Sequence, residues 1–209
     1  MTDKARKAGR PKSIDPGVVA ELAMRQYWSE GVQAVSVNRI CEIARVSKPS
    51  LYREFGSEDG LLAAAIRRYD STAIQPMIEL LVSDRPVDDI VNEIVATVTQ
   101  DGTGTDFPAG CMVTPMFDMR GHIGPQSQTL VDDIRTALDT AYAAFVGRAV
   151  PKHASGNRAP RALALFLASA VASAMRAMMR GDPPSDVEAV LRVAFSVVAT
   201  EPGPSDRQD

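Results

Sequence analysis

The sequence predicts an all-α protein, and three observations support this fold class. Apolar residues recur at intervals of three and four along nearly the whole chain, which is the period of an amphipathic helix. The alternation typical of β-strands does not extend over a useful length at any point. Of the 209 residues, 45% are hydrophobic and 23% are charged, so the chain can bury a sizeable core.

The first 70 residues contain four expected helices, each preceded by a residue that can cap it. Asp15 followed by Pro is a strong helix start, and Gly31 is the expected end of that first helix. Short second and third helices are expected after Ser36 and Ser47, and a fourth after Ser57. Pro is tolerated in the first turn of the third helix, because an N–H there has no partner within the helix.

The two short helices of "SVNRICEIARVSKPSLYREFG" (36–56) almost touch, which indicates a helix-turn-helix. In that motif the first helix braces the second, and the second enters the major groove of DNA. A plain corner between two core helices is the alternative, and spacing alone does not separate the two. The outer face of the second helix carries side chains that can donate to phosphates or base edges: Ser47, Lys48, Ser50, Tyr52 and Arg53.

Beyond residue 75 the chain is again mostly helical. Ser185 and Glu188 have the spacing of a capping box, which would open a last helix that ends near Ala199. The other segments are expected as a helix over 86–99, a loop over 100–109, a short apolar stretch over 110–121, a long helix over 126–149 and an Ala-, Leu- and Met-rich helix over 161–180.

Charge is distributed unevenly along the chain. Residues 1–70 hold 12 basic and 9 acidic side chains, whereas the remainder holds 11 basic and 17 acidic ones. This asymmetry indicates a basic arm that meets a polyanion and an acidic body that does not. The arm "RKAGRPK" (6–12) resembles an AT-hook core, so minor-groove contacts are expected from Arg6, Lys7, Arg10 and Lys12. A flexible tail with non-specific affinity is the alternative.

No apolar run approaches the ~20 residues that a membrane span needs, and no secretory signal precedes the first helix. Cys41 and Cys111 are the only cysteines, and both lie in apolar surroundings. They are interpreted as reduced thiols rather than as a disulfide pair. We therefore expect a cytoplasmic protein that does not contact a membrane.

Residues 15–70 resemble the N-terminal domain of the TetR family of transcriptional regulators, most clearly in "AVSVNRICEIARVSKPSLYREFGSEDGLLAAAI". The residues that fall on recurring positions of the family are Ser36, Ile40, Ala44, Val46, Ser47, Leu51, Tyr52, Phe55 and Leu61. The resemblance implies a three-helix DNA-binding domain followed by a larger helical domain for ligand binding and dimerisation. The stretch "GCMV" is also similar to a Gly-Cys-apolar stretch in one branch of the family.

The resemblance also implies roles for individual residues. Tyr52 and Ser36 would contact backbone phosphates, whereas Lys48, Ser50 and Arg53 would lie at or near base edges. Tyr52 could instead be a half-buried packing residue, and Arg53 a solvated surface charge. With the arm, the predicted DNA-binding set is Arg6, Lys7, Arg10, Lys12, Ser36, Arg45, Ser47, Lys48, Ser50, Tyr52 and Arg53.

Three residues depart from the family pattern. Arg45 stands where relatives usually have Gly in the turn, and in a left-handed conformation it would cost on the order of 1 kcal/mol. Arg45 could also adopt another conformation or contact a phosphate. Glu58 replaces a frequent Lys at the start of the fourth helix, and Glu54 adds an acid to the third. These departures bear on DNA affinity more than on fold.

The expected domains are a basic arm (1–14), the helix-turn-helix domain (15–70), a regulatory and dimerisation domain (71–200) and a disordered tail (201–209). Pseudo-palindromic operators require a two-fold dimer, and the last two helices are the expected interface. Ala164, Ala168 and Ala172 form a small-residue face there, although this face could also be internal core. A pocket for a small apolar or amphipathic ligand is expected from Met112, Met116, Phe117, Met119, Tyr142, Phe145 and Phe166.

The function expected from these features is that of a DNA-binding regulator. It is expected to be a repressor whose ligand shifts the dimer to a state with weaker DNA affinity. An enzyme is disfavoured, because His122 and His153 are the only histidines and neither has a metal-ligand spacing. No catalytic residue, metal ligand or cofactor site is expected. A recombinase would place its DNA reader after a catalytic domain. A helical binding protein without DNA function, and a regulator without a ligand response, remain as alternatives.

Overall fold

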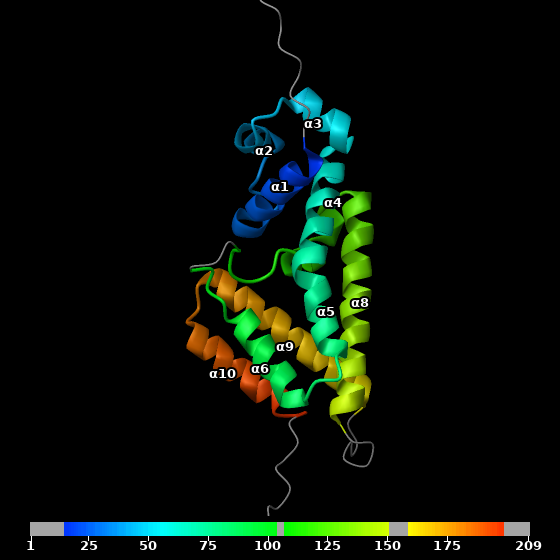
Figure 1. Ribbon diagram of the computed structural model, residues 1–209, viewed down its shortest axis with the longest axis vertical. Coiled ribbons are helices and arrows are strands. Elements are labelled where there is room, and N and C mark those ends of the chain that lie inside the picture. Colours follow the sequence, from blue (N-terminus) through cyan, green and yellow to red (C-terminus); the bar gives the residue numbers. More distant parts are fainter. Residues whose placement is uncertain (1–14, 104–106, 151–158, 199–209) are drawn as a thin grey trace, which may run out of the picture.

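The computed structural model describes residues 15–103, 107–150 and 159–198, and every regular element in these residues is helical. The molecule is elongated, with the second and third helices at one end and the last two at the other (Figure 1). The helices are α1 (Pro16–Glu30), α2 (Val37–Ala44), α3 (Lys48–Phe55), α4 (Glu58–Tyr69), α5 (Gln75–Val82), α6 (Val87–Val98), α7 (Thr114–Asp118), α8 (Pro125–Ala149), α9 (Pro160–Arg180) and α10 (Pro184–Phe195). A π-helical turn, η1 (Asp70–Ile74), and a 3₁₀ turn, η2 (Arg120–His122), complete the order.

The four expected caps of the N-terminal helices are confirmed. Each side-chain oxygen accepts a hydrogen bond from a backbone N–H in the first turn of its helix, which satisfies a donor that has no partner within the helix. The acceptor residues and their N···O distances are Asp15 with Gly17 (3.0 Å), Ser36 with Arg39 (3.2 Å), Ser47 with Ser50 (3.3 Å) and Ser57 with Gly60 (3.0 Å).

The predicted capping box at the last helix is wrong. Helix α10 begins at Pro184, flanked by Pro183, and no side chain caps it. Because proline already has a helical φ and needs no N–H partner in the first turn, it sets the start of the helix. Ser185 therefore lies inside the first turn, where its side chain does not act as the cap. The helix also ends at Phe195, before the expected Ala199.

Helices α4 and α5 are joined through η1 into one long rod, which connects the two ends of the molecule (Figure 1). The sequence did not predict α5. Pro76 lies in the first turn of α5 and has no N–H, so it removes one bond of the regular helical ladder. The wider π-helical turn lies immediately before this proline and allows the helical path to continue instead of ending.

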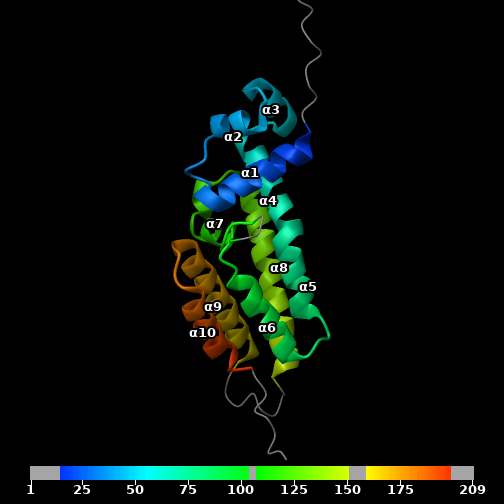
Figure 2. The same ribbon diagram turned by 60° about the vertical axis from the view of Figure 1, so that its left-hand side comes forward.

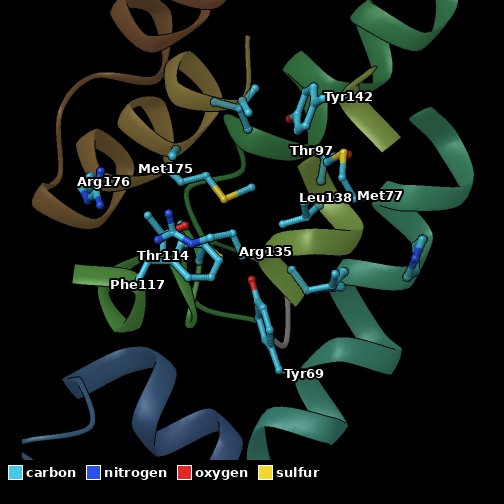
Figure 3. Close-up of a pocket in the computed structure, with 18 of the residues that line it drawn as sticks. Tyr69, Met77, Thr97, Thr114, Phe117, Arg135, Leu138, Tyr142, Met175 and Arg176 are labelled. Atoms are coloured by element: carbon cyan, nitrogen blue, oxygen red, sulfur yellow. The ribbon is translucent and has the colours of Figure 1, made fainter. Parts of the chain in front are cut away.

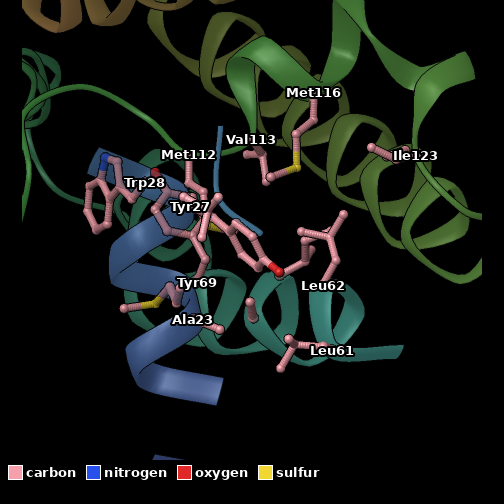
Figure 4. Close-up of a cluster of buried hydrophobic side chains, with 14 of the residues drawn as sticks. Ala23, Tyr27, Trp28, Leu61, Leu62, Tyr69, Met112, Val113, Met116 and Ile123 are labelled. Atoms are coloured by element: carbon pink, nitrogen blue, oxygen red, sulfur yellow. The ribbon is translucent and has the colours of Figure 1, made fainter. Parts of the chain in front are cut away.

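A first hydrophobic cluster lies where α1 and α4 meet the segment around α7 and the start of α8 (Figure 4). Trp28 belongs to this cluster, with Tyr69 edge-on at a ring-centroid distance of 4.8 Å and Phe107 stacked at 5.6 Å. Met112 and Val113 are buried in the same cluster. This core thus includes residues on both sides of residue 70, and the division into domains at that point remains a prediction.

Asp59 links the start of α4 to the start of α8. Its carboxylate accepts hydrogen bonds from the backbone N–H groups of Gln126 (2.9 Å) and Ser127 (3.1 Å). The hydroxyl of Ser127, which is fully buried, donates to the Asp59 carbonyl oxygen at 3.3 Å. At Gly124, a Cβ atom would lie 2.3 Å from the Asp59 Cγ, so the absence of a side chain permits this close approach. Asp59 therefore caps a helix distant from it in sequence.

A second hydrophobic cluster fills the other end, between α5, α6, α8, α9 and α10. Phe145 and Phe195 meet edge-to-face there, with ring centroids 6.1 Å apart. Ala164 on α9 is buried in this cluster and Ala168 packs against it, so part of the predicted small-residue face belongs to the internal core. In a second view α9 and α10 lie side by side (Figure 2).

Among the described residues, α9 is the one helix long and apolar enough to cross a membrane by length and composition. Core helices and helices at subunit interfaces meet the same criterion. In this chain α9 packs against α8 and α10, and 28% of its apolar window is buried. Its remaining apolar surface is exposed, which bears on the assembly discussed below.

Candidate nucleic-acid interface and internal cavity

The turn between α2 and α3 is tight and contains a left-handed residue. Arg45 has φ 54° and ψ 42° and is the one non-glycine residue with positive φ in the part of the chain that the structure describes. Its N–H bonds the Glu42 carbonyl at 3.2 Å, and the Val46 N–H bonds the Cys41 carbonyl at 3.0 Å. These two bonds end α2 and turn the chain directly into α3. Arg45 therefore adopts the left-handed conformation that the sequence analysis gave as one of its alternatives.

Helix α3 is held to the rest of the protein by one side. Leu51 is fully buried in the first cluster, and Phe55 packs against the same cluster. Side chains on other faces of α3 remain accessible, among them those of Lys48 and Arg53. This arrangement gives a short helix with an accessible polar surface at the end of an elongated molecule (Figure 1).

A chain of hydrogen bonds runs along the exposed surface of α3. The Ser47 hydroxyl donates to the Ser50 hydroxyl at 2.9 Å, and an Arg53 Nη donates to the same Ser50 oxygen at 3.2 Å. These residues are three apart, so they share a face of the helix. The network orders the Arg53 guanidinium while leaving most of its donors available for an acceptor outside the protein.

Tyr52 makes two contacts on the same surface. Its hydroxyl donates to Glu58 Oε1 at 2.9 Å, and the Lys48 ammonium lies 5.6 Å from the centre of its ring. The ring of Tyr52 packs against the first cluster, as the packing alternative expected, while its hydroxyl makes a polar contact at the surface. The hydroxyl that was predicted to contact a phosphate therefore has an acceptor, Glu58, within the protein.

The other predicted DNA contacts fall in two groups. Ser36 is exposed at the N-terminus of α2, where its oxygen caps the helix and its hydroxyl hydrogen can still be donated. Arg6, Lys7, Arg10 and Lys12 lie outside the described residues. The structure therefore brings the α2–α3 part of the predicted set to one end of the molecule and does not describe the arm.

A cavity of about 470 Å³ lies between the rod formed by α4 and α5, helix α8 and helix α9 (Figure 3). This volume lies within the range of small-molecule sites, ~300–1,000 Å³. Trp28, Tyr69 and Phe107 line the side toward the first hydrophobic cluster, and Met77 and Leu138 line the side toward the second. The cavity therefore contacts both hydrophobic clusters.

Two tyrosines contribute hydroxyls to this cavity. Burial raises the pKa of Tyr69, and the adjacent Cys111 raises it further. Burial likewise raises the pKa of Tyr142, again with a contribution from Cys111. Both hydroxyls therefore remain protonated at physiological pH and can donate hydrogen bonds. Cys41 and Cys111 are both free thiols, as expected.

The predicted pocket residues are distributed over several environments. Phe117 and Tyr142 line the cavity of 470 Å³. The three methionines Met112, Met116 and Met119 line a smaller cavity of about 220 Å³ beside the end of α1. Phe145 and Phe166 line neither cavity: Phe145 is fully buried in the core, and Phe166 lies on the outer face of α9. Helical spacing marked these residues as inward-facing but did not show which would border empty space.

Sequence reasoning did not identify several polar cavity residues. Thr114, Arg135 and Arg176 line the same cavity as Phe117. Thr114 begins α7, and Arg135 lies on α8. No spacing rule distinguishes a surface arginine from one at a cavity mouth, so these residues required the tertiary structure.

The outer faces of α9 and α10 carry large apolar side chains that no described residue covers. Leu165 and Phe166 are 64% and 47% exposed on α9, and Val190 and Val193 are 56% and 73% exposed on α10. The four residues are exposed on two helices that pack against each other, and Leu165 also borders the cavity of 470 Å³. Such patches typically mark contact sites with another protein surface.

The N-terminal helices of this chain are similar to a known family of proteins. The sequence model described as "Bacterial regulatory proteins, tetR family" matches residues 20–65, which contain most of α1, all of α2 and α3, and part of α4. Over these residues the chain is similar to the DNA-binding segment of the TetR family. The matched segment includes the left-handed turn and the exposed face of α3. The similarity to the family model therefore lies in the segment that forms the candidate DNA interface.

Individual relatives extend the similarity over more of the chain. The HTH-type transcriptional repressor BdcR of Escherichia coli is 28% identical over 151 residues, which are 72% of this chain and 75% of that protein. The repressor ComR of the same organism is 31% identical over 106 residues, half of each chain. A solved structure of the TetR family regulator CifR in complex with operator DNA superimposes with a TM-score of 0.67 at 24% identity, covering 90% of this chain and 98% of that one.

Proposed function

We propose that this protein is a member of the TetR family and a DNA-binding transcriptional regulator that acts as a repressor. One observation carries the proposal: the accessible polar surface of α3, ordered by the hydrogen bonds from Ser47 and Arg53 to Ser50. A helix held on one side and polar on the other has the form required to enter a major groove. The repressors BdcR and ComR and the operator complex of CifR support the assignment.

The proposed contacts divide into positioning and reading groups. Ser36 and Tyr52 bind backbone phosphates and set the orientation of the domain on the duplex. Lys48, Ser50 and Arg53 reach base edges, because they occupy the first two turns of α3. The residues of the arm, Arg6, Lys7, Arg10 and Lys12, add minor-groove contacts. Ser47 and Arg45 complete the proposed set of contacts, close to the sugar-phosphate backbone of the DNA.

The operator-bound form is a homodimer that associates through α9 and α10. Pseudo-palindromic operators require two reading helices related by two-fold symmetry. The exposed Leu165 and Phe166 of α9 and Val190 and Val193 of α10 supply the apolar surface for this interface. A self-complementary patch of this kind suits a two-fold dimer, because each residue meets the same surface of its partner.

A ligand in the cavity of 470 Å³ weakens DNA binding by favouring a dimer with a different separation of its reading heads. The rod of α4 and α5 supports this coupling, since Tyr69 lines the cavity while Glu58, at the other end of α4, lies beside Tyr52. A ligand that binds one arrangement better than the other shifts the equilibrium by that difference in affinity and no more.

Fluorescence anisotropy on labelled duplexes tests the proposal. The probes are the DNA that flanks the gene of this protein and a scrambled duplex of equal length, across a salt series. We expect tight, sequence-dependent binding whose logarithm falls steeply with the logarithm of salt concentration. Equal and weak binding to both duplexes would remove the support for a regulator of its own gene region.

A matched pair of variants locates the interface. Arg53→Ala on α3 should weaken binding to the specific duplex by about 1–3 kcal/mol if the guanidinium reads a base. Arg161→Ala removes the same charge from the exposed start of α9 and should leave affinity nearly unchanged. Equal losses in both variants would mean that net charge, and not the surface of α3, determines binding.

A further inference from the structure

The cavity between α4, α5, α8 and α9 contains polar groups without protein partners. Thr114 and Tyr142 are 4% and 3% exposed, and both line the cavity. Neither hydroxyl has a hydrogen-bond partner among the residues that the structure describes. Neither oxygen is among the sealed, unpaired side-chain atoms of the described residues, so both are reached from the cavity and can bond to a ligand that fills it.

Arg135 adds a positive charge at the same place, which interacts electrostatically with Asp132 on the same helix but forms no ion pair with it. Its guanidinium carbon lies 4.3 Å from the centre of the Phe117 ring, and both residues line the cavity. No carboxylate in the described part of the chain forms an ion pair with Arg135. The aromatic ring holds the guanidinium plane in place while its N–H donors remain available. Figure 3 shows Arg135 between Phe117 and the Tyr69 hydroxyl.

The other charged groups around the cavity are mostly neutralised. Arg176 is hydrogen-bonded to Asp118, and Glu93 to Arg85. Asp139 lies four residues after Arg135 on α8 and forms no ion pair with it, so it is the one competing charge among the lining residues described. The position of Arg135 over Phe117, beside the Tyr69 hydroxyl, favours the arginine as the charged contact for a ligand.

We propose that the ligand of this cavity is an amphipathic organic anion: a single carboxylate on an aromatic or long apolar body. This inference rests on the ligand-responsive function proposed above and specifies its chemistry. Arg135 binds the carboxylate through two parallel N–H···O bonds, a geometry that the guanidinium fork provides. Thr114 donates to the same carboxylate or to an adjacent polar atom.

The apolar body of the ligand lies away from Arg135, among Met77, Leu138 and Met175. Figure 3 shows these three side chains directed toward the same space, from α5, α8 and α9. Methionine side chains adapt to bodies of different shape, so the cavity accepts a series of related acids. Tyr142 provides a hydrogen bond for a polar group on the distal part of the ligand.

Trp28 allows binding to be measured directly in the full-length protein without DNA. It is the only tryptophan of the chain, it lines the cavity, and it stacks on Phe107. The probes are ω-phenylalkanoates from phenylacetate to 6-phenylhexanoate, each paired with its neutral amide and with the amine of equal length. We expect saturable changes of Trp28 fluorescence with at least one acid, and at least tenfold weaker binding of its amide and amine.

Variants of two arginines separate the proposed anchor from general charge. Arg135→Gln should weaken binding of the acid at least tenfold and leave binding of the amide unchanged. Arg180→Gln is the matched control, because Arg180 lies on α9 and is paired with an acid, Asp182, but does not line the cavity, and it should change acid affinity less than twofold. Thermal unfolding of both variants verifies that they fold.

Several results would overturn the proposal. They are equal affinity for acid and amide, tighter binding of the amine through Asp139, an unchanged acid affinity in Arg135→Gln, or no binding by any acid at millimolar concentration. The DNA anisotropy assay keeps this test separate from the proposed function. Acid binding without release of the duplex would support the ligand class and contradict regulation by that ligand, whereas absence of duplex binding leaves the fluorescence result valid.

Discussion

Replacement of Asp59 by alanine tests whether contacts between α4 and α8 stabilise the fold. The Asp59 carboxylate accepts two backbone hydrogen bonds at the start of α8, and α8 has no cap from its own flanking residue Gly124. Loss of a helix cap costs up to about 2 kcal/mol, and hydrogen bonds to a charged group lie at the upper end of such values. We therefore expect Asp59→Ala to lower the free energy of unfolding by about 2 kcal/mol.

Urea denaturation followed by circular dichroism measures this change. For a chain of this length, 2 kcal/mol corresponds to a decrease in Tm of about 4–8 °C. Asp59→Asn retains one oxygen acceptor but loses the charge, so its destabilisation should be smaller than that of the alanine variant. The ordering of the two variants distinguishes a hydrogen-bonding role from a steric one.

Asp88→Ala is the matched control. Asp88, like Asp59, lies in the first turn of its helix, where a carboxylate interacts favourably with the helix dipole. It is exposed and caps no second helix among the described residues, so its loss should cost at most about 0.5 kcal/mol. If Asp59→Ala were no more destabilising than Asp88→Ala, the bonds to α8 would not contribute to stability, and the reasoning would be refuted.

Four further variants test single features. Arg45→Gly should raise the free energy of unfolding by up to about 1 kcal/mol, because glycine tolerates the left-handed conformation, as urea denaturation would show. Glu58→Ala should increase DNA affinity about two- to fivefold by removing a negative charge and releasing the Tyr52 hydroxyl, measured by anisotropy. Val193→Glu should shift the protein from dimer to monomer in analytical ultracentrifugation. Burial raises the pKa of Glu21, but hydrogen bonds from Arg68 and Arg25 outweigh this effect and hold the pKa below 4.5. The ionised Glu21 therefore stabilises the fold above that pH, and this stabilisation is lost as the pH falls. Glu21→Gln should flatten that part of the profile of unfolding free energy against pH.

Each variant has a control and a contradicting outcome. Arg45→Ala keeps the backbone strain and should not stabilise; equal stabilisation by Ala and Gly would exclude conformational strain. Glu79→Ala removes an exposed acid from α5, and an equal gain in DNA affinity there would mean that only net charge matters. Val18→Glu alters an exposed valine on α1, which is 55% exposed, and monomerisation by that variant would exclude a specific α9–α10 interface. For Glu21, an unchanged acid limb of the stability profile in Glu21→Gln would contradict the ion-pair account.

The sequence by itself determined the local features of this protein. The four N-terminal caps, the tight turn after Ala44 and the helices over 86–99, 126–149 and 161–180 depend on interactions between residues at most a few positions apart, so spacing and residue type were sufficient to predict them. The family was recognisable for the same reason, because its recurring positions lie within one short segment.

Only the tertiary structure decided which residues meet across the chain. The spacing of Asp59 and Gln126, 67 residues apart, contains no sign that a carboxylate of α4 caps α8. Helical periodicity likewise separates the inner face of a helix from its outer face, but it does not separate core residues from residues of a cavity wall. Phe145 and Phe117 were therefore both predicted to line the pocket, whereas the structure places Phe145 in the core. Arg135 became a candidate for anion binding because Phe117 lies beneath its guanidinium and no carboxylate among the described residues pairs with it. These are properties of packed side chains, which depend on how separate helices are brought together in space.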